Sequence, residues 1–367
     1  MSANREQQAT PKPKLLWDCG TAYDFFQSLM VLHHPSKFSV RGAWTAGMRA
    51  RLSPDARDVL EKSQAIIHMP AHWIHALPKP KDVETALWSL GQIPPAKRLE
   101  ALSLGPCDPP KEIAVLLRNV AKHGAWKKKD LELLHDCYQR ECAEHKRPPS
   151  YKKLVGALDV WAEAEAFGER YLAALRNYRE VFFVEEEQRI EPALKEALAR
   201  AQRLSKKLPL SDLLEELSQG IRIDEPLAVN ELVFVPSYWI TPLIIMLPVG
   251  PKRQLFLFGA RPPQASLIPG ETVPDTLVRA LKALCDPTRL KILHYLGQEP
   301  LAAAQLARRL RLRTPTVMHH LHALRLAGLI QVTMGVDAGK EKNRYGRRPN
   351  ALSDVCDMLK GYLGNGR

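Results

Sequence analysis

The residues best suited to chemistry lie near the C-terminus, where a helix is predicted from Thr314 onward. Its apolar positions, Val317, Leu321 and Leu324, fall at the spacing of one buried helical face. The opposite face and the start of the helix carry mostly polar and basic side chains: Arg313, Thr314, Thr316, Met318, His319, His322 and Arg325. Such side chains can reach base edges in the major groove of DNA. The pattern therefore indicates a helix that reads a duplex.

A second group of cationic residues follows directly. Residues 329–334 alternate as a strand does, 335–342 form a polar tip that contains glycine, and 343–345 return as a second strand. The hairpin and its end carry Lys340, Lys342, Arg344, Arg347 and Arg348. Beside a DNA-reading helix, such a cluster suits phosphates or a narrow minor groove. A hairpin of this composition standing alone would more simply be a solvated loop.

Three short helices must position these groups. Asp286 and Pro287 are typical of a helix start, and Leu290, Ile292, Leu293 and Leu296 give that helix a buried stripe ending at Gly297. A second helix is predicted over 301–310, and the turn 311–313 joins it to the helix at Thr314. Helix, turn, helix and hairpin in this order predict a winged helix-turn-helix, in which the last helix enters the major groove.

Two segments resemble one known family. KALCDPTRLKIL (282–293) and TVMHHLHALRLAGLI (316–330) resemble the corresponding segments of the ArsR-type winged helix-turn-helix transcriptional regulators. The resemblance covers roughly the last 90 residues. It implies binding to double-stranded DNA and a homodimer formed by the helices at 279–284 and 353–363. The apolar face of the last helix would supply Val355, Met358, Leu359 and Tyr362.

The chain also departs from the family pattern. Arg313 stands where the family usually has a small capping residue, which allows the cap to shift to Thr314, and Met318 replaces a usual serine. The metal sensors of the family carry a cysteine pair on the first helix of the motif, or Asp and His on the last helix. Residues 303–306 contain no cysteine and 354–363 contain no histidine. We therefore expect neither of the family's two metal sites in this chain.

Charge is distributed unevenly along the 367 residues. Residues 275–367 hold 16 Lys and Arg against 7 Asp and Glu, whereas the rest of the chain holds 37 against 33. A basic end on a nearly balanced body is typical of a nucleic-acid-binding domain attached to a body with another task. The six cysteines form no CxxC pair, and the start is polar, so a cytoplasmic protein is expected. The longest apolar run, 238–249, is too short for a membrane span.

The expected fold class is mainly α (α+β). We predict a disordered tail at 1–14, a helical body at 15–230, a small antiparallel β segment at 231–261, a Pro-rich linker at 262–274 and the winged helix-turn-helix at 275–367. Helices are expected at 21–34, 54–69, 82–90, 95–104, 111–123, 130–146 and 211–218. Two long helices should fill 150–208, with a break near 181–184 and a new segment opened by Pro192.

Other groups could bind ligands, but a plainer interpretation is favoured for each. His68, His72 and His75 have the spacing of one helical face, yet Pro70 interrupts it. A second possible metal cluster consists of His135, Cys137, Cys142 and His145. The aromatic residues that could line an effector pocket are Trp17, Tyr23, Phe25, Phe26, Trp44, Trp73 and Trp88. We expect core or surface roles for these residues, a buried structural thiol at Cys285, and neither a metal nor a cofactor.

The sequence lacks the common enzyme motifs, including GxGxxG, GxSxG, HExxH and a Gly-rich phosphate loop. The leading hypothesis is a dimeric, sequence-specific DNA-binding regulator, not an enzyme, whose body senses an unknown effector. The family resemblance favours repression over activation. One alternative is a winged-helix module that binds protein, or nucleic acid without sequence preference. Another is an enzyme with its catalytic site in the N-terminal body and a winged-helix dimerisation domain.

Overall fold

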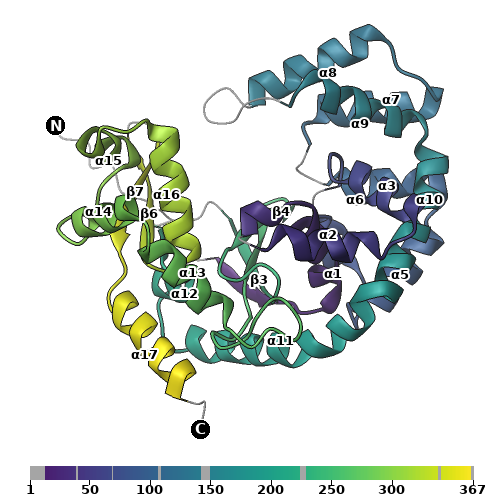
Figure 1. Cartoon of the computed structure of the whole chain (residues 1–367). Coiled ribbons are helices and arrows are strands. Elements are labelled where there is room, and N and C mark those ends of the chain that lie inside the picture. Colours follow the sequence, from purple (N-terminus) through teal and green to yellow (C-terminus); the bar gives the residue numbers. More distant parts are fainter. Residues whose placement is uncertain are drawn as a thin grey trace, which may run out of the picture. The chain divides into compact units, whose positions relative to one another are not determined.

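The computed structural model describes residues 13–38, 40–67, 69–105, 109–141, 149–223, 229–337 and 340–364, with the backbone alone for 335–337 and 340–342 (Figure 1). The chain divides into two compact units. Unit 1 contains 1–17, 193–246 and 256–367, and unit 2 contains 18–192 and 247–255. Helices dominate both units, and the strands form two small sheets, which confirms the mainly α fold class with an α+β character.

Unit 2 is built from helices with an aromatic core. Its elements are α1 (Thr21–His33), η1 (Pro35–Phe38), α2 (Gly42–Ala50), α3 (Pro54–Ser63), α4 (Ala71–Ala76), α5 (Val83–Gln92), α6 (Pro95–Ser103), α7 (Lys111–His123), α8 (Lys128–Glu141), α9 (Tyr151–Ala162), α10 (Ala164–Tyr178), η2 (Arg179–Phe183) and the start of α11 (Val184–Ser205). The six helices expected between 21 and 146 are present, although α3 ends at Ser63 and residues 142–146 lie outside the described part of the chain. Helices α2 and α4 were not predicted.

The expected break near 181–184 is a change of helical pitch. Residues Arg179–Phe183 form one π-helical turn, and α11 continues directly from it. Phe182 and Phe183 are buried there, so packing keeps this β-favouring stretch helical. Pro192 lies inside α11, and the expectation that it opens a new segment was wrong.

A four-stranded sheet connects distant parts of the sequence. The strands β1 (Lys14–Trp17), β3 (Glu231–Ser237), β4 (Ile245–Gly250) and β5 (Arg253–Gly259) are ordered β1-β3-β5-β4. Strands β3, β4 and β5 lie within the β segment predicted at 231–261. Strand β1 was not predicted; it pairs in parallel with β3, from Lys14 opposite Glu231 to Trp17 opposite Phe234. Phe234 and Phe256 pack with Ala201 of α11 and with α12 (Leu210–Leu217) in one core.

Hydrogen bonds connect the Pro-rich segment 262–274 to residues on either side of it. The hydroxyl of Tyr238 donates to the carbonyl of Ser266 at 3.0 Å, and the amide of Leu267 donates to Asp275 Oδ2 at 2.7 Å. Leu267 is itself buried. Residues 262–274, which were predicted to be a linker, are therefore fixed by contacts within unit 1.

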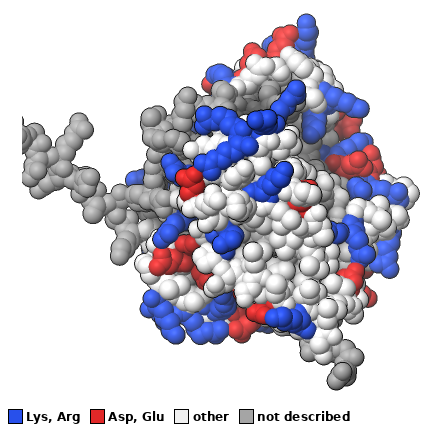
Figure 2. All heavy atoms as spheres, turned by 60° about the vertical axis from the view of Figure 1, so that its left-hand side comes forward, with Lys and Arg blue, Asp and Glu red and all other residues white. Residues whose placement is uncertain are grey.

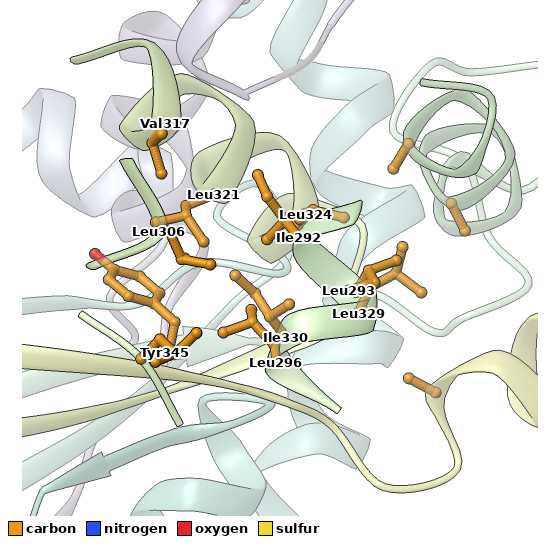
Figure 3. Close-up of a cluster of buried hydrophobic side chains, with 14 of the residues drawn as sticks. Ile292, Leu293, Leu296, Leu306, Val317, Leu321, Leu324, Leu329, Ile330 and Tyr345 are labelled. Carbon is orange, nitrogen blue, oxygen red and sulfur yellow. The ribbon is translucent and has the colours of Figure 1, made fainter. Parts of the chain in front are cut away.

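Residues 275–364 of unit 1, called the head here, form the winged helix-turn-helix. It consists of α13 (Asp275–Leu284), α14 (Pro287–Leu296), α15 (Ala303–Leu310), α16 (Thr314–Leu326), β6 (Ile330–Asp337), β7 (Lys340–Arg347) and α17 (Ala351–Gly364). The antiparallel pair β6 and β7 is the wing, which Leu301 extends through two backbone hydrogen bonds of 2.9 Å with Tyr345. Figure 3 shows α14, α15, α16 and the wing meeting in one hydrophobic core.

Two residues of the head were placed wrongly by the sequence analysis. Leu290 was expected in the buried stripe of α14 but is 48% exposed. Cys285 was expected to be buried and is exposed at the end of α13. The core contact of α14 is made by Ile292, Leu293 and Leu296, and Leu290 lies on the outer face of the helix.

The start of α14 is capped as expected. The carboxylate of Asp286 accepts a hydrogen bond of 3.0 Å from the amide of Arg289, and Pro287 occupies the first helical position. That backbone hydrogen bond holds the pKa of Asp286 below its ordinary value. The cap satisfies an amide that would otherwise lack a partner.

We predict that Asp286→Ala lowers the free energy of unfolding by about 1 kcal/mol at pH 7, because a helix cap is lost. The native pKa is depressed, so the contribution of the carboxylate is present above the pKa of an unfolded Asp and is lost as the pH falls through the native pKa. Urea unfolding at pH 7 and near pH 3 would measure this. Asp286→Asn, which keeps an acceptor oxygen, should lose less; equal losses would contradict the capping role.

Candidate nucleic-acid interface

A tight joint sets the angle between α15 and α16. Arg311 adopts a left-handed conformation with φ of 55°, and the amide of Leu312 donates to the carbonyl of Ala307 at 3.0 Å. Arg313 is the N-cap residue of α16 and makes no side-chain capping hydrogen bond. The cap therefore does not shift to Thr314, which is the first residue of the helix. Arg313 and Thr314 are exposed at the start of α16, where Pro315 has no N–H and the amide of Thr316 donates to the carbonyl of Arg313 at 3.0 Å.

The two faces of α16 differ as the sequence predicts. Val317, Leu321 and Leu324 are at most 1% exposed and point into the core (Figure 3). The exposed positions are Thr314, Pro315, Thr316, Met318, His319 and His322. His320 is partly buried next to Asp286, and burial lowers its pKa. The structure thus brings the polar face of α16 to the surface as one continuous strip.

Arg325 differs from the other residues of α16 that were predicted to contact DNA, because it is not exposed. It was expected on the exposed face, but it is only 7% exposed, and that expectation was wrong. Its guanidinium donates to the backbone carbonyl of Ser218, a residue just beyond the end of α12. The cause is a segment more than 100 residues earlier in the chain that covers this end of α16, which no local pattern could indicate.

The sequence segment that contains α15 and α16 is basic, although Asp286 at the start of α14 lies beside α16. Residues 301–336 contain five arginines and no Asp or Glu. Arg309 is paired with Glu299 at 2.6 Å, outside that stretch. Arg308, Arg311 and Arg313 are exposed and form no ion pair with any residue that the structure describes. Figure 2 shows Lys and Arg gathered in groups on this side of the molecule, around a broad uncharged area.

The wing provides further exposed cations. Arg344 and Arg347 are exposed, whereas Arg348 is partly buried and donates to the carbonyl of Gly328 at 3.0 Å. Lys340 and Lys342 lie on β7 opposite Asp337 and Gly335, and their side chains are outside the described part of the structure. Tyr345 is buried, and its hydroxyl lies 3.7 Å from the sulfur of Met318. Met318 therefore lies where α16 meets the wing.

The predicted dimer residues do not form one exposed face. Val355 is buried in the core of the head, so its apolar surface is covered within one chain. Met358 and Leu359 are partly buried against the same core, and Met358 contacts the hydroxyl of Thr276 on α13. The large apolar side chains that α17 exposes are Leu352 near its start, at 40%, and Tyr362 and Leu363 at its end, at 38% and 69%.

The histidine and cysteine groups are dispersed among different partners. His72 bonds to the carbonyl of Ala101 at 2.9 Å and His75 to the carboxylate of Asp18 at 3.0 Å, while His68 lies outside the described residues. His135 stacks on Tyr151, and Cys137 contacts Glu112. Cys142 and His145 also lie outside the described residues. No group of three metal-binding side chains occurs within the described parts of the chain.

The aromatic residues considered for a pocket are mostly packed against one another. Tyr23, Phe25 and Phe26 are buried in unit 2, and Phe26 makes an edge contact with Trp73. Trp44 similarly contacts Phe182. In unit 1, Trp17 stacks on Phe234 at 5.0 Å. Trp88, by contrast, is 64% exposed.

Among the described residues, the structure contains no helix that combines the length and the apolar character needed to cross a membrane.

The head is a winged helix-turn-helix by its elements and their order, and comparison with known proteins agrees. A family model described as a helix-turn-helix domain matches residues 284–333. An uncharacterized HTH-type transcriptional regulator, MJ0229 of Methanocaldococcus jannaschii, is 33% identical over 69 residues, which are 19% of this chain and 73% of that protein. The crystal structure of NolR from Sinorhizobium fredii matches 24% of this chain and 86% of that chain, at 27% identity and a TM-score of 0.20.

These findings identify the protein as a member of the HTH-type transcriptional regulators, which bind DNA.

Proposed function

We propose that the protein is a sequence-specific regulator that binds double-stranded DNA with α16 in the major groove and the wing on the adjacent backbone. The observation that carries this proposal is the division of α16 into a fully buried face and an exposed polar face, within a stretch free of carboxylates. A helix with this division can approach phosphates without charge repulsion from its own surface.

Within this proposal the exposed residues have different tasks. Thr316, His319 and His322 are placed to contact base edges, and Met318 to make an apolar contact such as one with a thymine methyl group. Arg313 and Thr314 lie exposed at the start of α16, where the helix dipole favours a backbone phosphate. Arg325 is left out of this set because it is buried.

The wing residues are assigned to the DNA backbone. Arg344 and Arg347 are exposed and carry the charge that a phosphate or a narrow minor groove attracts. Lys340 and Lys342 are assigned to the DNA backbone only because they lie on β7. Arg348 makes a hydrogen bond within the head, so its main task in this scheme is structural.

We further propose a homodimer and regulation by an effector that binds the N-terminal body, with repression as the outcome. The exposed Tyr362 and Leu363 at the end of α17 supply an apolar contact for a second copy. Two heads related by a twofold axis would read an inverted repeat. An effector that changes the spacing of the two copies of α16 needs only a few kcal/mol of differential binding to empty an operator.

A second candidate is an interaction module that binds protein, or nucleic acid without sequence preference. Met318 and Leu312 favour it, because both are large apolar side chains more than one third exposed next to the helix joint. Such residues are common at protein interfaces.

Selection from a random pool of DNA duplexes, with purified full-length protein near physiological salt, tests the proposal. Enrichment of an inverted repeat with half-sites about one helical turn apart is the expected result. Retention without sequence enrichment that disappears steeply as salt rises would contradict sequence-specific binding and support the interaction module.

We predict that Arg344→Ala weakens binding to every duplex and reduces the slope of log affinity against log salt by about 1, since one phosphate contact is lost. Titrations of one selected and one scrambled duplex at several salt concentrations would measure this. Arg140→Ala in unit 2, at an arginine paired with Glu112, removes the same charge elsewhere and should leave the slope unchanged.

A different change is expected for His319→Ala. Because His319 is exposed on α16 and is assigned a base contact, the preferred sequence should change at one position of each half-site. Repeating the duplex selection with the variant would show it. Identical preferences for the variant and the wild type would remove His319 from the base-reading set.

The dimer is tested at the end of α17. Tyr362→Asp should shift the protein toward the monomer, because it places a charge in the proposed apolar contact. Lys360→Asp introduces a carboxylate at an 80% exposed position of the same helix, with a larger change of charge, and serves as the control. Sedimentation velocity would give the mass of each; a wild-type monomer at micromolar concentration would contradict the homodimer.

A further inference from the structure

One strand of the wing sheet comes from outside the head. Strand β2 (Ile221–Ile223) pairs in parallel with β6, from Ile221 opposite Val332 to Ile223 opposite Met334. The amide of Val332 donates to the carbonyl of Gly220 at 2.8 Å. The sheet order is therefore β2-β6-β7, with β2 on the edge. Residues 218–223, called the strap here, lie alongside the wing and the end of α16.

The strap follows α12 through a sharp turn. Gln219 and Gly220 have φ angles of 55° and 104°, and the amide of Ile221 donates to Ser218 Oγ at 2.8 Å. A Cβ atom added to Gly220 would lie 3.1 Å from the side chain of Arg348 and 3.2 Å from that of Gln331. Glycine is needed here both for the backbone angle and for the close contact with the head.

The strap covers the cation of Arg325, for which the described part of the chain provides no counter-ion. Arg325 is 7% exposed, its guanidinium donates to the carbonyl of Ser218, and its Nη1 has no hydrogen-bond partner. No carboxylate among the described residues pairs with it. Burial, with a smaller contribution from the charge of Arg348, lowers its pKa to about 10. A buried charge without a counter-ion destabilises the state that contains it.

The position of Arg325 on α16 suggests a better partner. Met318, His322 and Arg325 are spaced i, i+4 and i+7, which places them along one side of the helix. The first two are exposed, and only the third is covered. A DNA phosphate at this end of α16 would supply the negative charge that the site lacks.

We propose that the strap is a detachable cover that holds Arg325 away from DNA, and that its release adds Arg325 to the phosphate-binding surface of α16. The proposal rests on the DNA-binding function proposed above. A three-residue edge strand is a weak attachment, since short strands make few hydrogen bonds. When the strap detaches, the hydrogen bonds of β2 are lost and Arg325 gains a charge-assisted contact with a phosphate. Any event that moves α12 would then change the affinity for DNA.

The test compares two substitutions at Arg222, an exposed residue in the middle of β2. Arg222→Pro removes both the side-chain charge and a backbone N–H, which disfavours the strand, whereas Arg222→Ala removes the charge alone. Affinity for a duplex enriched by the selection would be measured at several salt concentrations. The proline variant should bind about tenfold more tightly than the alanine variant, with a salt slope steeper by about 1.

Two further variants make the test specific. Gly220→Val should also detach the strap, because valine is strained at this φ and its side chain would press on Arg348. It should show the same gain in DNA affinity, and it replaces the proline variant if that variant does not fold. Adding Arg325→Gln to either variant should abolish the gain, because the released cation is no longer present.

The outcomes separate the two proposals. Wild-type protein that binds no duplex would overturn the proposed function and this inference together. Wild-type protein that binds DNA, with strap variants that bind equally or more weakly than Arg222→Ala, would overturn the inference alone. A gain that persists in the presence of Arg325→Gln would also overturn the inference alone.

Discussion

The burial of Val317, Leu321 and Leu324 is the contact on which the DNA-binding surface depends. These side chains fix the rotation of α16 about its own axis, because a rotation by one residue would turn each of them about 100° out of the core. Burial of each contributes about 1.5–3 kcal/mol, so the alternative rotations are strongly disfavoured. Once the rotation is fixed, Thr316, His319 and their exposed neighbours must face outward.

The sequence was most informative where structure is local. Apolar residues at helical spacing located α14, α15 and α16, and Asp286 with Pro287 marked the start of α14 correctly. The two strands of the wing were found by alternation and a glycine-containing tip, although each is longer than expected. The exposed residues of α16 followed from the same periodicity, with one exception.

Several of the errors involve contact between residues far apart in the sequence. Arg325 has the sequence context of an exposed residue, and only the carbonyl of Ser218, 107 residues earlier, explains its burial. Strands β1 and β2 have four and three residues, too few for an alternating pattern to be recognised. Val355 illustrates the same limit: an apolar face predicts burial, but not whether the same chain or a second copy covers it.

The parallel pairing of β1 with β3 has a consequence for synthesis of the protein. Lys14 lies opposite Glu231, so the partner of β1 is made 217 residues later. At a synthesis rate of about 5–20 residues per second, β1 remains unpaired for roughly 10–40 s on the ribosome. During that interval helices α1 to α10 can form from local contacts, while Leu15 and Trp17 lack their eventual neighbours. The nascent chain therefore carries an uncovered apolar segment at 14–17, which a chaperone could contact until residue 234 has emerged.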